Sequence, residues 1–204
     1  MNELLYWVGM TAVAVNALTG VLEAERKQMD LIGAVMIAAF TALGGGTLRD
    51  ILLDRQVFWI ANQTYLAVGI VFGILTFFWA RRRRISPDLF LYPDAVALAL
   101  FSIVGTQVAL QLDTPWLAAS LMGVITGVFG GVLRDVFCNE VPLVFLAGEL
   151  YATAAWAGAL VLIGLQQVGV DATHAAWAGM ATVLILRMAA IHLRIRLPTF
   201  AARK

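Results

Sequence analysis

The stretch Gly45-Gly46-Thr47-Leu48-Arg49-Asp50 returns 85 residues later as Gly130-Gly131-Val132-Leu133-Arg134-Asp135. The same offset aligns further small residues on both sides of this motif: Ala12 with Ala97, Gly20 with Gly105, Thr41 with Thr126, and Gly73 with Gly158. Chance is a poor explanation for so many matches at one spacing. The sequence therefore predicts an internal duplication with the glycine-Arg-Asp motif at the same place in each copy.

The composition places both copies in a membrane. The chain has 204 residues, 61% of them hydrophobic, with 14 Lys and Arg, 13 Asp and Glu, and a net charge of +1. Soluble domains contain about 45–50% apolar and about 25% charged residues. We therefore predict an all-α membrane protein that is not an enzyme, has no nucleic-acid partner and, with Cys138 as its single cysteine, has no thiolate metal cluster.

Uncharged apolar windows of nearly spanning length follow one another along the chain. A spanning helix needs roughly 20 such residues, and seven windows fit, at 4–22, 31–48, 63–80, 95–112, 115–133, 141–165 and 173–193. The start, Met1-Asn2-Glu3, lacks the positive region of a removable signal peptide, so we expect the first window to be retained. Residues 1–204 are predicted to form a single transmembrane domain with seven transmembrane helices.

The duplication predicts how these helices are arranged. Repeat one covers about 4–80 and repeat two about 89–165, so each contains three windows. An odd number of crossings forces the second copy into the bilayer upside down relative to the first, and transport proteins often place their pathways between such inverted repeats. The seventh helix, at about 173–193, stands outside this symmetry.

The distribution of Lys and Arg predicts the orientation, because positive charge near span ends is retained in the cytoplasm. The face reached after the first, third, fifth and seventh windows collects eleven of the fourteen: Arg26, Lys27, Arg81, Arg82, Arg83, Arg84, Arg134, Arg194, Arg196, Arg203 and Lys204. We expect an external N-terminus and a cytoplasmic C-terminus. The run 81–84 is interpreted as a topology signal, with anionic lipid headgroups as a second interpretation.

Glycines make the middle helix of each repeat a candidate pathway. Gly44, Gly45 and Gly46 in one copy, and Gly130 and Gly131 in the other, cluster in helices near an Arg-Asp pair. Glycine clusters favour bends, and backbone freed by a bend in hydrocarbon must be buried or line a wet cavity. Oxygens of Thr41, Thr126 and Asn16 are candidates to contact an ion or water. The alternatives are tight helix packing through the small residues, and hydroxyls that bond only to their own backbone.

The charged residues have two interpretations as well. Arg49 and Asp50, like Arg134 and Asp135, either mark the interfacial ends of the spans or lie at depth, where they tune or gate passage. Glu149 and Arg187 are at similar expected depth and are candidates for a buried ion pair, unless Arg187 extends to the interface.

At the two glycine-Arg-Asp stretches, and in its three-plus-three-plus-one spans, the sequence resembles the prokaryotic branch of the trimeric intracellular cation channel (TRIC) family. The resemblance implies a homotrimer with one pore in each protomer, conducting monovalent cations, chiefly potassium with some sodium, and lipid associated with the pore. It also implies that the second and fifth helices are kinked and form the pore walls. Phe129 replaces the first glycine of the triplet in the second copy, so the two kinks are not expected to be equivalent.

A potassium-preferring cation channel of the bacterial cytoplasmic membrane, without a cofactor, is the function that these features favour. Some bacterial members of the family are described as glycine transporters, so a transporter of a glycine-like small solute is the alternative. In that case the positive ends of helix segments near the breaks would hold a carboxylate. A structural or lipid-binding protein would leave the duplicated Arg-Asp motif unexplained.

Overall fold

A computed structural model describes residues 3–83, 86, 88–146, 150–193 and 195. Within these residues the chain is helical and contains no strand. The helices are α1 (Glu3–Arg26), α2 (Leu31–Leu52), α3 (Phe58–Ala61), α4 (Thr64–Ala80), α5 (Leu91–Leu110), α6 (Trp116–Phe137), η1 (Leu143–Phe145), α7 (Tyr151–Gln167) and α8 (Ala172–Leu193).

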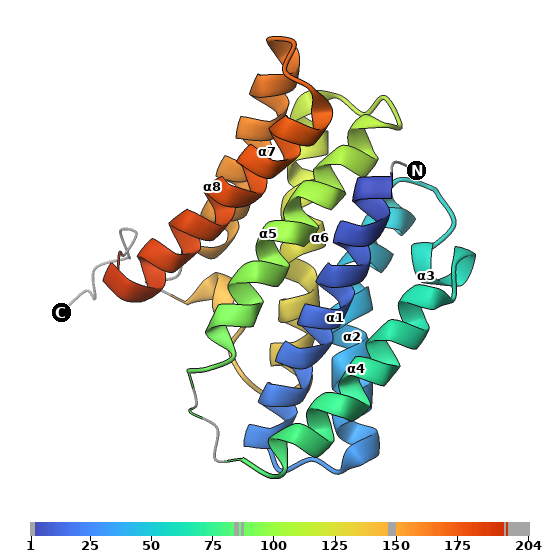
Figure 1. Cartoon of the computed structure of the whole chain (residues 1–204), viewed down its shortest axis with the longest axis vertical. Coiled ribbons are helices and arrows are strands. Elements are labelled where there is room, and N and C mark those ends of the chain that lie inside the picture. Colours follow the sequence, from blue (N-terminus) through green and yellow to red (C-terminus); the bar gives the residue numbers. More distant parts are fainter. Residues whose placement is uncertain (1–2, 84–85, 87, 147–149, 194, 196–204) are drawn as a thin grey trace, which may run out of the picture.

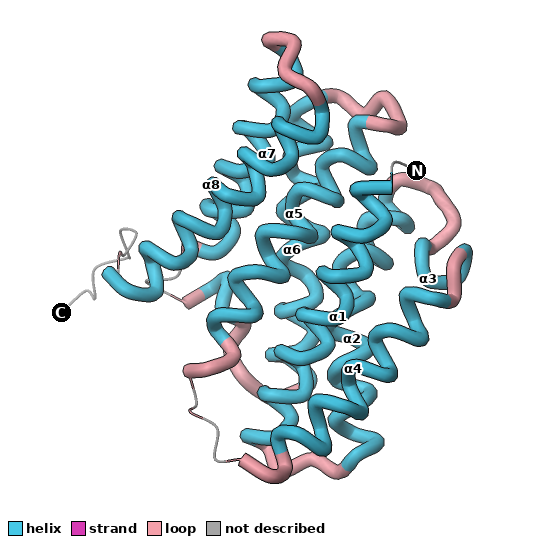
Figure 2. Tube along the Cα trace, in the orientation of Figure 1, coloured by secondary structure: helices cyan, strands magenta, loops and turns pink. Residues whose placement is uncertain are grey.

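The long helices form one bundle (Figure 1). Helix α2 packs against α1, α4 and α6, and α5 packs against α1, α6, α7 and α8. Helix α1 starts at the upper end of the bundle in Figure 1, whereas α5 starts at the lower end. Figure 2 shows that short loops join most of the helices at the two ends of the bundle. The motif-bearing helices, α2 and α6, therefore contact each other and lie against α1 and α5.

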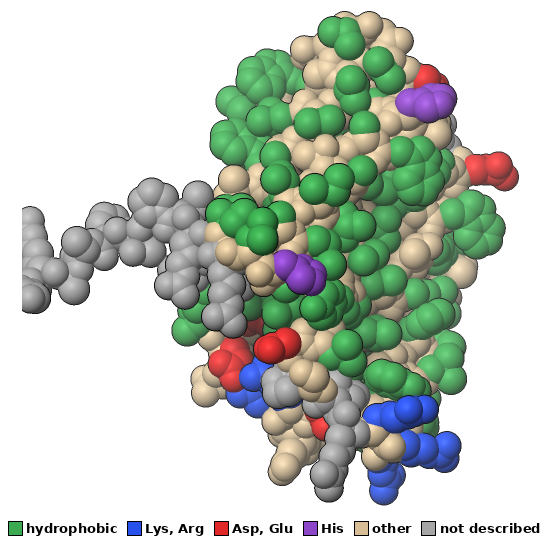
Figure 3. All heavy atoms as spheres, turned by 60° about the vertical axis from the view of Figure 1, so that its left-hand side comes forward, with side chains coloured by type: hydrophobic (Ala, Val, Ile, Leu, Met, Phe, Trp, Pro, Cys, Tyr) green, Lys and Arg blue, Asp and Glu red, His purple; other side chains and the backbone are tan. Residues whose placement is uncertain are grey.

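The surface matches a membrane environment. Figure 3 shows hydrophobic side chains over the middle of the molecule, and Lys and Arg gathered at its lower end. Large apolar side chains such as Leu75, Trp177 and Ile185 are exposed. Five helices, namely α1, α2, α5, α6 and α8, are long and apolar enough to cross a bilayer. Helix α4 is apolar but has 17 residues, and α7 also has 17. This is a multi-pass helical membrane protein.

Local structure repeats at the 85-residue offset. The bounds of α2 and α6 differ by that number at both ends, and α3 and η1 begin at the matching residues Phe58 and Leu143. Each middle helix ends in the same turn, where Asp54 or Asn139 has a positive φ. Short polar side chains tolerate this left-handed conformation better than other non-glycine residues. The repeated sequence therefore encodes a repeated helix, terminal turn and short following helix.

The sixth apolar window differs from the expectation, because its helix begins at Tyr151 and not near residue 141. Pro142 lacks an N–H group and precedes the single turn η1, and the Leu143 N–H donates to Asp135 Oδ2 at 2.9 Å. A side-chain acceptor for this N–H fixes the segment outside the long helix. The described apolar residues 141–146 therefore form a connection and not the first turns of a span.

Candidate functional site

Helices α2 and α6 meet at the glycines of the two motifs. A Cβ atom on Gly45 would collide with the carbonyl oxygen of Thr126, and one on Gly130 would collide with the carbonyl oxygen of Thr41. Both helices are α-helical without interruption across these positions. The glycines thus bring two backbones into direct contact within unbroken helices, and the expected bend at these glycines stays a prediction.

The polar side chains near this crossing bond to backbone. The hydroxyls of Thr41 and Thr126 donate to the carbonyls of Ile37 and Met122, one turn earlier, each at 2.6 Å. Asn16 of α1 donates its amide to the Thr41 carbonyl at 2.7 Å. For the hydroxyls, the interpretation that they bond to their own helix is confirmed. Asn16 ties α1 to α2 at the level where α2 meets α6.

The other small residues of α6 serve close packing on α5. A Cβ atom on Gly123 would meet Thr106 and Ser102, and one on Gly127 would meet Ser102 and Leu98. Small residues let helix backbones approach closely in a membrane. Tight helix packing therefore describes this face of α6.

The first Arg-Asp site lies in the last turn of α2. Arg49 is 4% exposed, and its Nε and Nη2 contact Asp50 Oδ1 at 2.9 and 2.7 Å. Asp50 Oδ2 accepts the N–H of Phe58 at 2.8 Å. Arg55 approaches the same Oδ1, with its Nε at 3.4 Å. Two guanidinium groups thus share one carboxylate. The pair is buried near a helix end, and its role in passage stays a prediction.

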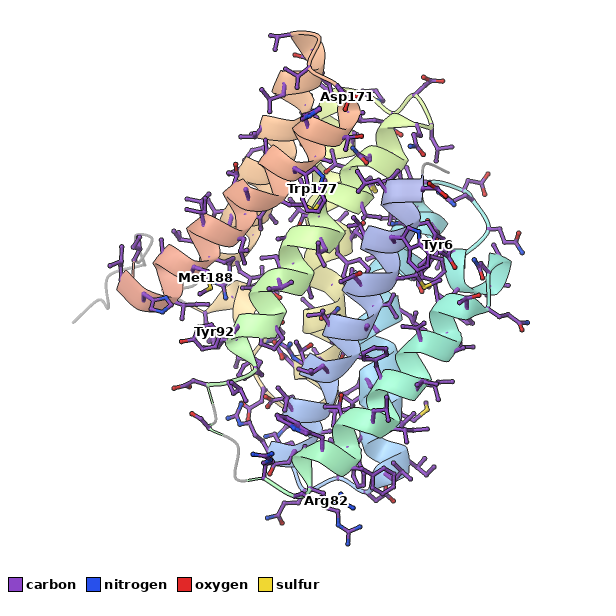
Figure 4. All side chains as sticks on the ribbon, in the orientation of Figure 1. Tyr6, Arg82, Tyr92, Asp171, Trp177 and Met188 are labelled. Carbon is purple, nitrogen blue, oxygen red and sulfur yellow. The ribbon has the colours of Figure 1, made fainter. Side chains whose placement is uncertain are left out.

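A cavity of about 130 Å³ opens beside this site. Its polar lining comes from Arg49, Arg55, Asn62 and Tyr65, and its other walls are Leu5, Gly9, Gly46, Phe58, Ala61, Phe101, Val104 and Val108. Tyr65 contacts the ring of Tyr6, which Figure 4 labels near the upper end of α1. The cavity therefore lies toward the end of the bundle where α1 begins.

The second Arg-Asp site is more enclosed and has more acidic groups. Arg134 has no exposed surface, and its Nε contacts Asp135 Oδ1 at 2.8 Å. Its Nη1 donates to Oδ1 of Asp94, on α5, at 2.6 Å. The ring of Phe90 lies 5.1 Å from the guanidinium carbon, within the range of a cation–π contact. Two carboxylates therefore surround one arginine.

Residues predicted to line the pore border two different hollows in the described part of the chain. Gly46 lines the cavity beside Arg49. Gly44 and Phe129 instead line a separate apolar groove of about 420 Å³, with Leu43, Leu133 and Trp59 among its walls. Gly131 faces the hydroxyl of Tyr151, 3.1 Å from the position of an added Cβ, and Arg134 Nη2. Pore lining by these residues stays a prediction.

Two ion pairs lie at the lower end of the bundle, one within α1 and one between two loops. Glu23, almost fully buried, pairs with Arg26 at 2.8 Å. Lys27, after α1, contacts Glu140, after α6, at 2.6 Å, and this contact lowers the pKa of Glu140 below its usual value. Arg82 lies at the same end of the molecule (Figure 4). Described residues of the basic run, 81–83, are exposed, and Arg84 lies outside the described residues.

Of the expected ion pair of Glu149 and Arg187, the structure describes only Arg187. Glu149 lies outside the described residues. Arg187 is fully buried, with its guanidinium carbon 4.8 Å from the centre of the Tyr151 ring. The alternative, in which Arg187 extends to the interface, does not match this burial, and the ion pair with Glu149 stays a prediction.

Sequence reasoning missed Asp94, Glu23 and Arg55 as partners in these sites. Asp94 lies just before the fourth apolar window and Glu23 just after the first, so both were treated as loop residues. The repeat offset singles out Asp94. Asp94 corresponds to Gly9, so the second copy has an acid where the first has none.

A duplicated helical bundle with a buried Arg-Asp pair near the end of each middle helix defines the class: a membrane protein of the transport type built from an internal repeat. The chain belongs to the glycine transporter family, whose model matches residues 6–81 and 91–167.

Relatives extend over nearly the whole chain. The UPF0126 inner membrane protein YadS of Escherichia coli K12 is 41% identical over 201 residues, which is 97% of each chain. A UPF0126 membrane protein of Vibrio cholerae is 40% identical over 205 residues, covering 100% of this chain and 85% of the relative. These similarities and the apolar helices place the protein in the bacterial inner membrane.

Solved structures confirm the resemblance to TRIC channels. The TRIC trimeric intracellular cation channel orthologue from Rhodobacter sphaeroides is 34% identical and has a TM-score of 0.91, covering 95% of this chain and 100% of that one. A TRIC cation channel structure that describes the basis of conductance is 30% identical, with a TM-score of 0.87 and 97% of both chains covered. The fold of this chain is the TRIC channel fold.

Proposed function

We propose that the protein is a channel for monovalent cations, with potassium preferred and sodium as a second permeant ion. The observation that carries this proposal is the TM-score of 0.91 to a TRIC cation channel at 34% identity over nearly the full chain. This chain forms a bundle of long apolar helices with charge concentrated in two buried sites. Such a bundle suits passive conduction better than catalysis.

We place the pore within one protomer, between α2 and α6, on the side that faces α1 and α5. The cavity beside Arg49 and Gly46 supports this placement, because it is a hollow that borders the middle helix of one repeat. The direct backbone contact at Gly45 and Gly130 then makes the described conformation a closed one. Opening requires α2 and α6 to separate at this contact. Arg49 and Arg134, each held by an aspartate, are the candidates for gating charges.

We infer that residues 4–80 and 89–165 form inverted repeats, with an external N-terminus and a cytoplasmic C-terminus. Support comes from the matched bounds of α2 and α6 and from the opposite starting ends of α1 and α5 (Figure 1). Arg26, Lys27 and the run that begins at Arg81 then lie on the cytoplasmic side, where positive charge is retained and anionic lipid headgroups are available. A homotrimer is the assembly we expect, and chemical crosslinking in mild detergent measures it.

A potassium flux assay tests the conduction proposal. The protein is reconstituted into liposomes loaded with potassium, and efflux is followed after dilution into a medium without permeant cation. A protonophore is added so that proton influx balances the charge, and empty liposomes with the same protonophore are the control. Channel function predicts efflux that rises with protein content and is lost for a large organic cation. Efflux equal to that of empty liposomes contradicts the proposal.

Transport of a glycine-like solute is the second candidate, and the Arg134 site favours it. Among the residues described, Arg134 Nη2 and Asp94 Oδ2 are buried without a hydrogen-bond partner. A spare donor and a spare acceptor at one site match the carboxylate and ammonium of a small amino acid. Saturable uptake of labelled glycine into the same liposomes, lost in Asp94→Asn, would support this candidate over the channel.

A further inference from the structure

The internal repeat allows the two Arg-Asp sites of this chain to be compared with each other. In both, the arginine Nε donates to Oδ1 of the following aspartate, at 2.9 Å for Arg49 and 2.8 Å for Arg134. In both, Oδ2 of that aspartate accepts the backbone N–H eight residues further on. The two sites therefore share one framework, and their differences point to what each can bind.

The differences concern the second charged neighbour of each arginine. Arg134 contacts a second carboxylate, that of Asp94. The residue at the matching place in the first copy is Gly9, which lines the cavity beside Arg49. Thus a carboxylate is present next to Arg134, whereas next to Arg49 there is open volume.

The balance of charged groups also differs between the two sites: acidic groups are in excess at the second site and basic groups at the first. The second site has one guanidinium and two carboxylates. The first has two guanidinium groups, those of Arg49 and Arg55, on the single carboxylate of Asp50. Both arginines line the cavity, and no Asp or Glu is among its lining residues. Arg49 is buried and Arg55 is partly exposed, and together they carry one positive charge more than Asp50 neutralises, so an anion entering this volume is favoured.

We propose that this cavity binds a small monocarboxylate with an apolar body. Its carboxylate takes the place beside Arg49 that the Asp94 side chain takes beside Arg134, and it also faces Arg55. Charge-assisted hydrogen bonds from guanidinium groups to a carboxylate are among the strongest in proteins. The apolar body lies against Phe58, Phe101 and Val104.

The size and polarity of the cavity limit the ligand. Its volume is about 130 Å³, and an apolar cavity of roughly 150 Å³ is large enough for benzene. A carboxylate with a body of three or four carbons is therefore of suitable size. A zwitterion fits poorly, since both oxygens of Asp50 already accept hydrogen bonds and no other acid lines the cavity to receive an ammonium group.

The ligand has a route from the aqueous phase. Ala61 is exposed, and Asn62 and Arg55 are partly exposed. All three belong to the connection between α2 and α4, at the end of the bundle opposite Arg82 (Figure 4). The site thus opens at one end of the bundle.

Calorimetric titration of the purified protein in detergent tests this proposal, with butyrate as the probe and butyramide as its uncharged match. We expect butyrate to bind and butyramide to bind at least tenfold more weakly. Arg55→Gln should weaken butyrate binding at least fivefold, whereas Arg82→Gln, which removes an exposed arginine at the other end, should leave it unchanged. Gly9→Asp should abolish binding, because it supplies the missing carboxylate from the chain itself.

Melting temperatures give a second readout, which does not depend on ligand binding, in case a variant loses binding because it is misfolded. An added Cβ at Gly9 meets Tyr65 at 3.4 Å, an ordinary contact, so the side chain can be accommodated. Gly9→Asp should melt at a higher temperature than Gly9→Asn, which has the same volume without the charge. Equal melting of the two would overturn the proposal.

Three binding results would overturn it as well: equal affinity for butyrate and butyramide, wild-type affinity in Gly9→Asp, or no effect of Arg55→Gln. Glycine that binds as tightly as butyrate would contradict the class of ligand. The titration uses no ion gradient, so a protein that fails the potassium flux assay can still bind butyrate, and the two proposals fail separately.

Discussion

Replacing Gly130 with alanine tests the direct backbone contact between α2 and α6. An added Cβ would lie closer to the Thr41 carbonyl oxygen than the 3.0 Å that real Cβ atoms keep, and ordinary contact begins at 3.4 Å. The obstacle is backbone and cannot rotate away, so the helices must separate. Overpacking of this kind costs about 1–3 kcal/mol in the free energy of unfolding.

Helix propensity acts in the opposite direction. Alanine is favoured over glycine by up to about 1 kcal/mol in a helix interior. Gly164, within α7, isolates this gain, because an added Cβ there meets nothing within 4 Å. Gly164→Ala should be neutral or stabilising, and Gly130→Ala should be less stable than Gly164→Ala by about 1–3 kcal/mol, the steric cost alone.

Unfolding of the two variants and the wild type in mixed micelles, titrated with a denaturing detergent, measures this difference. Gly45→Ala should resemble Gly130→Ala, since its added Cβ would collide with the matching carbonyl of Thr126. If Gly130→Ala were as stable as Gly164→Ala, the close contact, and with it the closure assigned to it, would be refuted.

Three further predictions concern charged groups. Asp50→Asn should destabilise the protein by about 3–5 kcal/mol, because it leaves two guanidinium groups without an acid; Asp54→Asn, at an exposed position, is the control, and an equal loss in both would contradict the reasoning. The pKa of Glu140 is lowered by Lys27, so this ion pair contributes stability above the unfolded pKa and loses it as pH falls through the lower, folded pKa; Lys27→Gln should remove this acid-dependent part of a melting curve, and an unchanged curve would refute it. The third prediction rests on the channel proposal. Gly9→Asp should raise potassium conductance at low salt, because it neutralises excess positive charge in the cavity beside Arg49. A lower conductance would contradict this.

The sequence predicts the long helices well, because each apolar window is bounded by charge. The repeat offset also fixes where α2 and α6 begin and end, since both copies carry the same turn after the motif. Residues 141–150 are the exception. The sequence predicts that they begin the sixth span, and hydropathy does not register that Asp135 accepts the Leu143 N–H and fixes residues 141–146 outside the long helix α7.

The candidate site is predicted less completely. Glycine clusters allow both a bend and a close approach of two helices, and composition does not separate these outcomes; the direct contact of Gly45 with the Thr126 carbonyl becomes visible only when α2 and α6 are placed together. The pairing of Arg134 with Asp94 joins residues 40 positions apart, so no local pattern reveals it. The absence of an acid at Gly9 was readable from the repeat alone.

Recording from single proteins in planar bilayers is the most direct test of conduction. With a tenfold gradient of potassium chloride, a pore selective for potassium reverses near the potassium potential, about 59 mV from zero. We predict discrete current steps that reverse close to that value. Reversal at the chloride potential, or silent bilayers from a preparation that accumulates glycine in liposomes, would contradict the account.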